Sequence, residues 1–210
     1  MATLFVDKVD PQSGTSLEIG SNGDTISVPS GATLDIASGA TLDTTGATVT
    51  GISGNPITEA DTFGLTSTQS ISSGTDTVLT GFNRDNEATF SKIGTGLSES
   101  SGVFTFGATG IYWVAASFYM QINGDLTYAS PKIAGTTNNS SYVNLVYNDQ
   151  SIKQVVGNTY ACNYLSAIFD CQDTSTHKVR LSIYGTQALN VLGGANDRHT
   201  YITVFRLGDT

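Results

Sequence analysis

The sequence predicts an all-β protein, with a short N-terminal β-repeat stalk and a C-terminal antiparallel jelly-roll sandwich. Short runs rich in β-branched and aromatic residues recur in the second half, and Gly, Asn and Asp turns separate them. No stretch of ten residues has the i, i+3, i+4, i+7 spacing of apolar residues that indicates an amphipathic helix. An eight-residue repeat fills much of the first quarter of the chain.

The composition excludes several classes of protein. The net charge is −9 and the nine Lys and Arg residues form no cluster, so we expect no nucleic-acid partner. No segment approaches the 18 apolar residues of a membrane span, so we expect no membrane insertion. The first ten residues lack the basic start and apolar stretch of a signal peptide, which favours assembly in a host cytoplasm.

Residues 1–20 form the first expected segment, a docking piece. Leu4, Phe5, Val6 and Val9 make a short strand-like run with little within the segment to pack against. A segment of this kind gains order when it binds a larger surface. We therefore expect residues 1–20 to dock on another protein of the assembly.

The second segment, residues 21–54, is the repeat stalk. Ser30–Asp35 is repeated eight residues later as Ser38–Asp43, and looser copies lie on both sides. Each copy joins a Gly turn, a Thr and one large aliphatic residue; these aliphatic residues are Ile26, Leu34, Leu42 and Val49.

One aliphatic residue per eight is too little to fold a single chain. Ordering eight residues costs about 1–2 kcal/mol each in backbone entropy, whereas burying one Leu contributes about 1.5–3 kcal/mol. The simplest solution is three chains wound together, with the four aliphatic residues stacked on the common axis. The alternative is a flexible linker, which the Gly, Ser and Thr content also allows.

The remaining residues divide into a polar connector, 55–74, and a head, 75–210. The only Trp, all nine Tyr and seven of the nine Phe lie in the head. The sequence predicts strands there at residues 77–82, 88–93, 103–106, 110–122, 142–148, 159–169, 177–185 and 200–207. About eight short strands at this spacing are typical of a sandwich or jelly roll.

The head resembles the complement globular-head and tumour necrosis factor (TNF) superfamily. Leu97, Phe104, Gly110, Tyr112 and Val114 have the spacing of that signature, and the last two expected strands are similar to its closing strands. The resemblance implies a jelly-roll head core containing Leu97, Phe104, Gly110, Tyr112 and Phe205. It also implies three-fold packing of heads about an apolar axis.

The departures from this family concern the stalk and the upstream part of the signature. Asn86 and Lys92 occupy two positions of the signature, and neither is of the residue type that the signature has there. No collagen-like Gly-X-Y stalk is present. The N-terminal half instead resembles the proximal part of bacteriophage fibre and appendage proteins. Together the two resemblances imply a trimeric virion protein rather than a complement protein or cytokine.

The chain shows no constellation of catalytic residues, so we expect no enzyme. A depolymerase site would need paired carboxylates, for which Glu99, Asp170 and Asp173 are the available residues. We expect no cofactor. Some members of the resembled family carry a structural calcium ion, and the loop residues Asp85, Asp125, Asp149, Asp173 and Asp197 are possible ligands. His177 and His199 lack the spacing of a metal pair.

Two further features concern the surface of the head. Cys162 and Cys171 are nine residues apart in one expected strand, on opposite faces, so we expect two free, mostly buried thiols. Loops 124–141 and 185–199 contain Tyr and Asn, which suit a neutral recognition surface for a host glycan or protein. Plain solvated loops are the alternative.

These expectations lead to a structural protein of a phage virion, with a homotrimeric fibre-like form and a head that contacts the host. Its N-terminal segment would bind another virion protein of the capsid, portal or tail. A capsid decoration protein that stabilises the shell is the first alternative, and a bacterial surface adhesin is the second.

Overall fold

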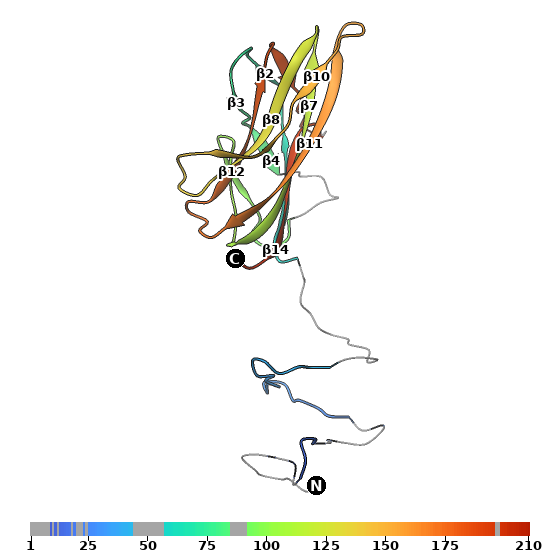
Figure 1. Ribbon diagram of the computed structural model, residues 1–210, viewed down its shortest axis with the longest axis vertical. Helices are drawn as coiled ribbons and strands as arrows, with labels where there is room; N and C mark the ends of the chain where they lie inside the picture. Colours follow the sequence, from blue (N-terminus) through green and yellow to red (C-terminus); the bar gives the residue numbers. More distant parts are fainter. Residues whose placement is uncertain are drawn as a thin grey trace. The chain divides into compact units, whose positions relative to one another are not determined.

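Figure 1 shows the computed structural model of the chain. The structure describes residues 9, 11, 13–17, 19, 23, 25–43, 57–84, 92–195 and 198–210. The chain divides into two compact units, Met1–Ser53 and Gly54–Thr210. The described residues contain strands and turns and no helix, and hence no helix able to cross a membrane.

The second unit is a sandwich of two antiparallel sheets (Figure 1). Sheet A has the order β2-β13-β7-β14-β1-β4, and β11 pairs with β7. Its strands are β1 (Ala60–Leu65), β2 (Gln69–Ile71), β4 (Phe82–Arg84), β7 (Gly110–Ile122), β11 (Thr159–Cys171), β13 (Leu189–Val191) and β14 (Tyr201–Gly208). The 13-residue strands β7 and β11 pair along their whole length.

Sheet B covers the other side of the core. It has the order β10-β8-β12-β6-β5, with β3 paired to β12 and β9 paired to β8. Its strands are β3 (Thr77–Val78), β5 (Ser98–Ser100), β6 (Val103–Thr105), β8 (Leu126–Thr136), β9 (Val143–Tyr147), β10 (Gln150–Ile152) and β12 (Lys178–Gly185).

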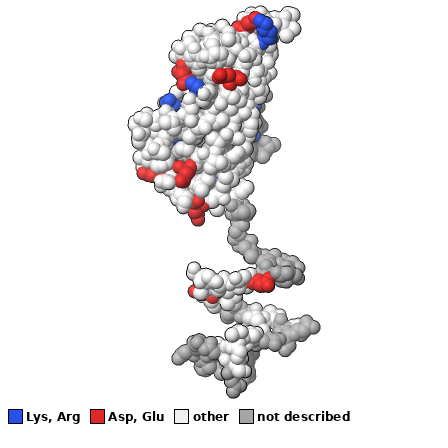
Figure 2. Space-filling model, in the orientation of Figure 1, with Lys and Arg blue, Asp and Glu red and all other residues white. Residues whose placement is uncertain are grey.

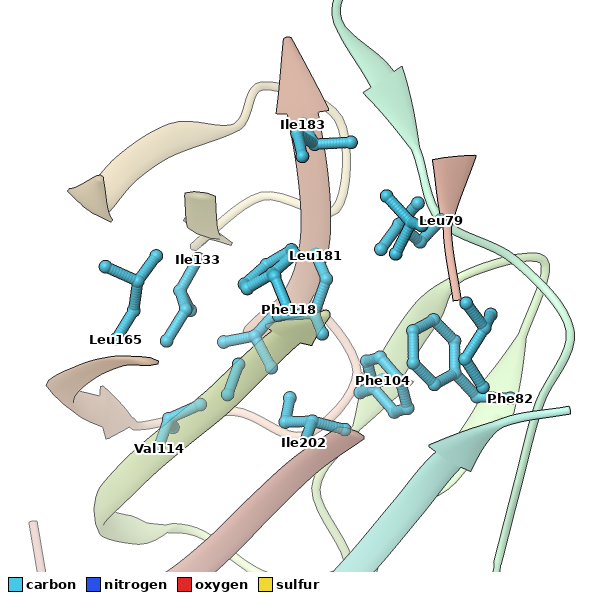
Figure 3. Packing of buried hydrophobic residues seen from close by; sticks show 14 of the residues in the cluster. Leu79, Phe82, Phe104, Val114, Phe118, Ile133, Leu165, Leu181, Ile183 and Ile202 are labelled. Atoms are coloured by element: carbon cyan, nitrogen blue, oxygen red, sulfur yellow. The ribbon is translucent and has the colours of Figure 1, made fainter. Parts of the chain in front are cut away.

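The core lies between the two sheets, because apolar residues alternate along the long strands. Figure 3 shows the apolar side chains of the core meeting in this space. The labelled residues Val114, Phe118, Leu165 and Ile202 come from sheet A, and Ile133, Leu181 and Ile183 come from sheet B. All seven are at most 3% exposed.

The signature residues occupy one end of this core. Phe104 in β6 is fully buried, and its ring meets Phe63 and Phe82 edge-on at centroid distances of 5.7 and 5.2 Å. Tyr112 packs on Phe106 at 4.4 Å and donates a hydrogen bond to the carbonyl of Ala108. The head-core residues Leu97, Phe104, Gly110 and Tyr112 are therefore buried as expected.

Gly110 is required where β7 begins. Its φ is +147°, and a Cβ there would overlap the guanidinium group of Arg206 and lie 2.7 Å from the carbonyl oxygen of Gly208. The glycine therefore lets the end of β14 approach the start of β7 closely.

Two buried carboxylates hold the segment before β5 against β1. Asp61 is fully buried, forms two-pronged hydrogen bonds with Arg84 and accepts the backbone N–H of Leu97 at 2.8 Å. Glu59 accepts the backbone N–H of Gly96 at 2.6 Å. Because each carboxylate is hydrogen-bonded, it can lie inside the sandwich.

The expected connector 55–74 is wrong as a structural assignment. β1 lies between β14 and β4, and β2 pairs with β13, so residues 60–71 belong to sheet A. The expected loop 124–141 is also wrong for most of its length, because it contains β8. The expected strand 88–93 lies mainly outside the described residues, and Ile93 forms an isolated bridge with Ala60.

The first unit contains two identical turns at the repeat spacing. The N–H of Ala32 donates to the carbonyl of Pro29 at 3.0 Å, and the N–H of Ala40 donates to that of Ala37 at 2.9 Å. Gly31 and Gly39 have φ values of +85° and +84° and occupy the third turn position, as in a type II turn. The backbone conformation therefore repeats every eight residues, as the sequence does.

Candidate functional site

The outer face of sheet A is the candidate site, which we call the aromatic face. It is formed by the side chains of β11, β7 and β14 that alternate with the core residues. Its large members are Tyr160, Tyr164 and Ile168 in β11, Ile111, Trp113 and Tyr119 in β7, and Tyr201, Phe205 and Leu207 in β14.

The rings of the aromatic face are ordered by cross-strand contacts. Trp113 stacks on Phe205 with ring centroids 5.7 Å apart, and Tyr119 stacks on Tyr160 at the same distance. Between these pairs lie the small residues Ala115 and Ser117. The face therefore presents fixed rings on both sides of a row of small residues.

Several large side chains of the aromatic face remain exposed in the single chain. Ile168 and Leu207 are each 59% exposed, and Tyr164 is 53% exposed. A contiguous apolar surface of this kind is uncommon on a monomer and is typical of an interface.

The aromatic face is also nearly free of charge. Among the outward residues of β7, β11 and β14, Asp170 at the end of β11 is the one charged side chain. Partial burial raises the pKa of Tyr164, and nearby Tyr201 raises it further. The Tyr164 hydroxyl is therefore a neutral hydrogen-bonding group at physiological pH.

The outer face of sheet B differs in chemistry. It carries three cations: Lys132 forms an ion pair with Asp76 at 2.9 Å, Arg180 lies 3.9 Å from the centre of the Tyr142 ring, and Lys178 donates to the hydroxyl of Thr105. Figure 2 shows charged side chains in small separated groups on the side of the molecule that it displays. Charged side chains of this kind are typical of a surface that stays in water. The two outer faces therefore suit different surroundings.

Phe205 is placed differently from the expectation. The core residues of β14 are Ile202 and Val204, and Phe205 points to the other side, where it is half-buried against Trp113. The alternation of β14 is as the sequence indicates, but both of its faces carry apolar residues. The pattern alone did not show which face lies in the core.

The two cysteines are free in the structure, and one of them is exposed. Cys162 lies on the aromatic face with its sulfur 3.3 Å from the hydroxyl of Ser117. Cys171 is buried, and burial raises its pKa to about 11. The prediction of opposite faces and free thiols is confirmed, whereas the prediction that Cys162 is buried is wrong.

The stalk residues Ile26, Leu34 and Leu42 are each more than 60% exposed in the single chain. Val28 and Ile36, two residues after Ile26 and Leu34, are exposed as well, so these repeats offer two aliphatic residues. Sequence reasoning missed this second position. Val49 and the docking residues Leu4, Phe5 and Val6 lie outside the described residues, and Val9 is exposed.

The acidic residues considered for catalysis or calcium form local hydrogen bonds. Glu99 accepts the N–H of Gly102, Asp173 accepts the N–H of Ser175, and Asp170 accepts a hydrogen bond from Gln172.

The residues considered for calcium are also hydrogen-bonded where the structure describes them. Asp125 pairs with Lys153, which lowers the pKa of Asp125, and Asp149 accepts a hydrogen bond from Ser130. Asp85 and Asp197 lie outside the described residues. Within the described ranges no three His, Cys, Asp or Glu residues are grouped as metal ligands.

The two histidines, His177 and His199, have different surroundings. His177 lies 6.2 Å from the ring of Phe169 near the start of β12. His199 packs on Tyr119 at 5.4 Å, and its buried Nδ1 atom has no hydrogen-bond partner among the residues that the structure describes. His199 therefore extends the aromatic face beside β7.

Comparison with known proteins identifies the fold. No protein-family model and no curated protein sequence matches the chain. The solved structure of murine APRIL at pH 8.0 superimposes with a TM-score of 0.51 and 15% identity, covering 71% of this chain and 98% of that one. Eiger TNF from S. frugiperda gives a TM-score of 0.52 and 16% identity, covering 72% of this chain and 93% of that one. The prediction of an all-β, antiparallel, TNF-like jelly roll is confirmed.

Proposed function

We propose that the chain is a homotrimeric, non-enzymatic structural protein of a phage virion. Its N-terminal segment anchors it to another virion protein, and its jelly-roll head is exposed and contacts the host. The observation that carries the trimer is the aromatic face, an uncharged and partly exposed surface across three adjacent strands.

A second copy of the chain is the partner that the aromatic face fits best. Because the face is nearly uncharged, it has little means of attracting a charged partner, whereas stacked aromatic rings and aliphatic residues suit a permanent interface. The charged residues of sheet B then remain in water. In a ring of three copies, each copy would contact its two neighbours through opposite halves of its aromatic face.

The need for partner chains is supported by the repeat as well as by the head. The aliphatic residues of the described repeats are exposed in the single chain, as the energetic argument requires of a segment that needs partners. Three chains cover them around one axis. The three-fold packing that the family resemblance implies for the head agrees with this number.

The virion role is supported by the repeat pattern and its similarity to phage fibre proteins. An alternative role as a capsid decoration protein uses the same trimer and the same docking segment. The two roles differ in what the head binds: a host surface in the first, and no host component in the second. A bacterial surface adhesin is the third candidate.

Two measurements test the proposal. Multi-angle light scattering of the full chain should give a mass of about three times 21.9 kDa, and a monomer would contradict the trimer. Adsorption of fluorescently labelled protein to host cells, compared with adsorption to capsids stripped of their appendages, separates the roles. Binding to host cells supports the host-contact role, and binding to capsids alone supports decoration.

A further inference from the structure

A cleft of about 190 Å³ lies at the end of sheet A where β7 stops. Ile71 ends β2, Ile122 ends β7 and Leu189 begins β13, and these three buried residues form its apolar floor. The walls carry the polar residues Asn123 and Asn190. The cleft therefore combines an apolar base with neutral hydrogen-bonding groups, as small-molecule sites do.

The polar wall is part of a hydrogen-bonded row that crosses four strands. Ser70 donates to Asn190 at 2.9 Å, Asn190 donates to Gln121 at 3.3 Å, and Gln121 donates to Tyr160 at 2.9 Å. An amide nitrogen has two hydrogens, and this row uses one from Asn190 and one from Gln121. Each amide is thus held in a fixed orientation with donor capacity left for a ligand.

Asn123, which also lines the cleft, is oriented in the same way. Its carbonyl oxygen accepts a hydrogen bond from Gln154 at 2.8 Å, which leaves its NH₂ group for a ligand. Ala188, an exposed residue at the rim, leaves the opening clear.

The cleft lies at one end of sheet A. Ala60 begins β1 and is aligned through Phe205 with Trp113. Ile122 is nine residues further along β7, or about 30 Å at the rise of a strand. The cleft is therefore opposite the end of the sheet at which β1 begins. Gln121 and Asn190 lie there on the same side of sheet A as Tyr160, so the cleft borders the end of the aromatic face.

We propose that this cleft binds one neutral sugar unit of a cell-surface glycan; this rests on the proposed host contact. A sugar ring offers paired hydroxyl groups to the amides of Asn123, Gln121 and Asn190, and its C–H surface to the apolar floor. No lining residue is charged, so an anionic or cationic ligand would lose hydration without a partner. The volume is below that of drug-sized sites, which limits the ligand to about one ring.

Saturation-transfer difference NMR of the full-length protein tests the inference. The probes are the methyl glycosides of glucose, galactose and N-acetylglucosamine, with glucuronic acid as the charged comparison. At least one neutral glycoside should bind, and the Ala188→Trp and Asn123→Ala variants should weaken its binding at least about tenfold. Val143→Trp and Asn144→Ala, matched changes on β9 of sheet B, should leave the affinity within about twofold.

Three results would overturn the inference: no neutral glycoside binds, Ala188→Trp and Asn123→Ala bind as well as the parent, or glucuronic acid binds as tightly. Circular dichroism shows whether each variant is folded, and Asn123→Ala serves if the larger Trp side chain disturbs the turn. Light scattering of the same samples keeps this question separate from the trimer. A trimer that binds no sugar contradicts the sugar site alone. A sugar-binding monomer contradicts the trimer alone.

Discussion

Trp113 and Phe205 stack on the outside of sheet A, with ring centroids 5.7 Å apart, although their strand neighbours Val114 and Val204 lie in the core. Two large rings on the outer face of a sheet have no part in the core of the single chain. Their contact explains why β14 is apolar on both sides: one side faces the core, and we infer that the other faces a second copy.

The aromatic face predicts that one charge will dissociate the head. Ile168→Asp places a carboxylate at a position that is 59% exposed in the single chain, so the fold of each chain should keep its stability. In the trimer the same carboxylate would be buried without a partner, which costs several kcal/mol. In a chain that also carries Leu34→Asp and Leu42→Asp, so that the repeat no longer joins the chains, light scattering should show a mass of 21.9 kDa at low protein concentration.

Val143→Asp is the matched control, because Val143 is 65% exposed on β9 of sheet B. In the same background, with Leu34→Asp and Leu42→Asp, this variant should keep the trimer mass. If both variants stay trimeric, the aromatic face is not the interface. If both dissociate, the effect of charge is not specific to that face.

Changes in the stalk should affect chain association in the repeat separately from association of the heads. The double change Leu34→Asp and Leu42→Asp should separate the chains in the repeat while the heads remain trimeric, because the two interfaces are formed by different residues. Hydrogen exchange should become fast in residues 25–43 and stay unchanged in sheet A. Thr33→Asp with Thr41→Asp adds the same charge beside the aliphatic positions and should keep more protection. Equal exchange in all three proteins would indicate a flexible linker.

The core predicts a large loss of stability for Phe104→Ala. The Phe104 ring fills the space between Phe63 and Phe82, and its removal should lower the free energy of unfolding by about 3–5 kcal/mol. Chemical denaturation monitored by Trp fluorescence measures this change. Tyr147→Ala on the exposed face of β9 should change the free energy by less than about 1 kcal/mol. Similar losses in the two variants would place Phe104 outside the cooperative core.

Gly110→Ala should destabilise the head more than Gly124→Ala. The two glycines have φ values of +147° and +141°, so both changes strain the backbone similarly. Only at Gly110 does the added Cβ meet another part of the chain, namely Arg206 and Gly208. Thermal unfolding should show about 1–3 kcal/mol more destabilisation at Gly110. Equal losses would mean that Arg206 moves aside without cost.

The two thiols should report on both burial and assembly. The pKa of Cys171 is raised to about 11, so at pH 9 only about one Cys171 in a hundred is the reactive thiolate, and the fraction increases toward pH 11. Cys162 should react with Ellman's reagent rapidly in the Ile168→Asp variant and slowly in the trimer. Rapid reaction of Cys162 in an intact trimer would place it outside the interface.

Much of the head could be predicted from the sequence because its long strands are locally distinctive. β7, β11, β12 and β14 alternate or carry continuous apolar runs, and Gly, Asn and Asp residues bound them. The spacing from Leu97 to Tyr112 led to the correct core residues. The free state of the cysteines followed from their odd separation in β11.

Other elements could not be predicted because their stability comes from distant partners. The sequence of β1, Ala-Asp-Thr-Phe-Gly-Leu, resembles that of a polar connector. It forms a strand because β14 and β4 pair with its two edges. Its Asp61 is buried only because Arg84 and Leu97 bind it. β8 contains Pro131 and Gly135, which weaken a local strand signal, and β12 stabilises it by pairing.

The sequence by itself determined the all-β class, the period of the repeat, the alternation of the long strands and the glycine at the start of β7. These depend on local propensity and spacing, which act within a few residues. Only the tertiary structure decided which face of sheet A is covered, since both sides of β14 are apolar. It also brought Ser70, Asn190, Gln121 and Tyr160 into one row from four strands. Strand pairing joins residues that are distant in the chain, and no local pattern carries that information.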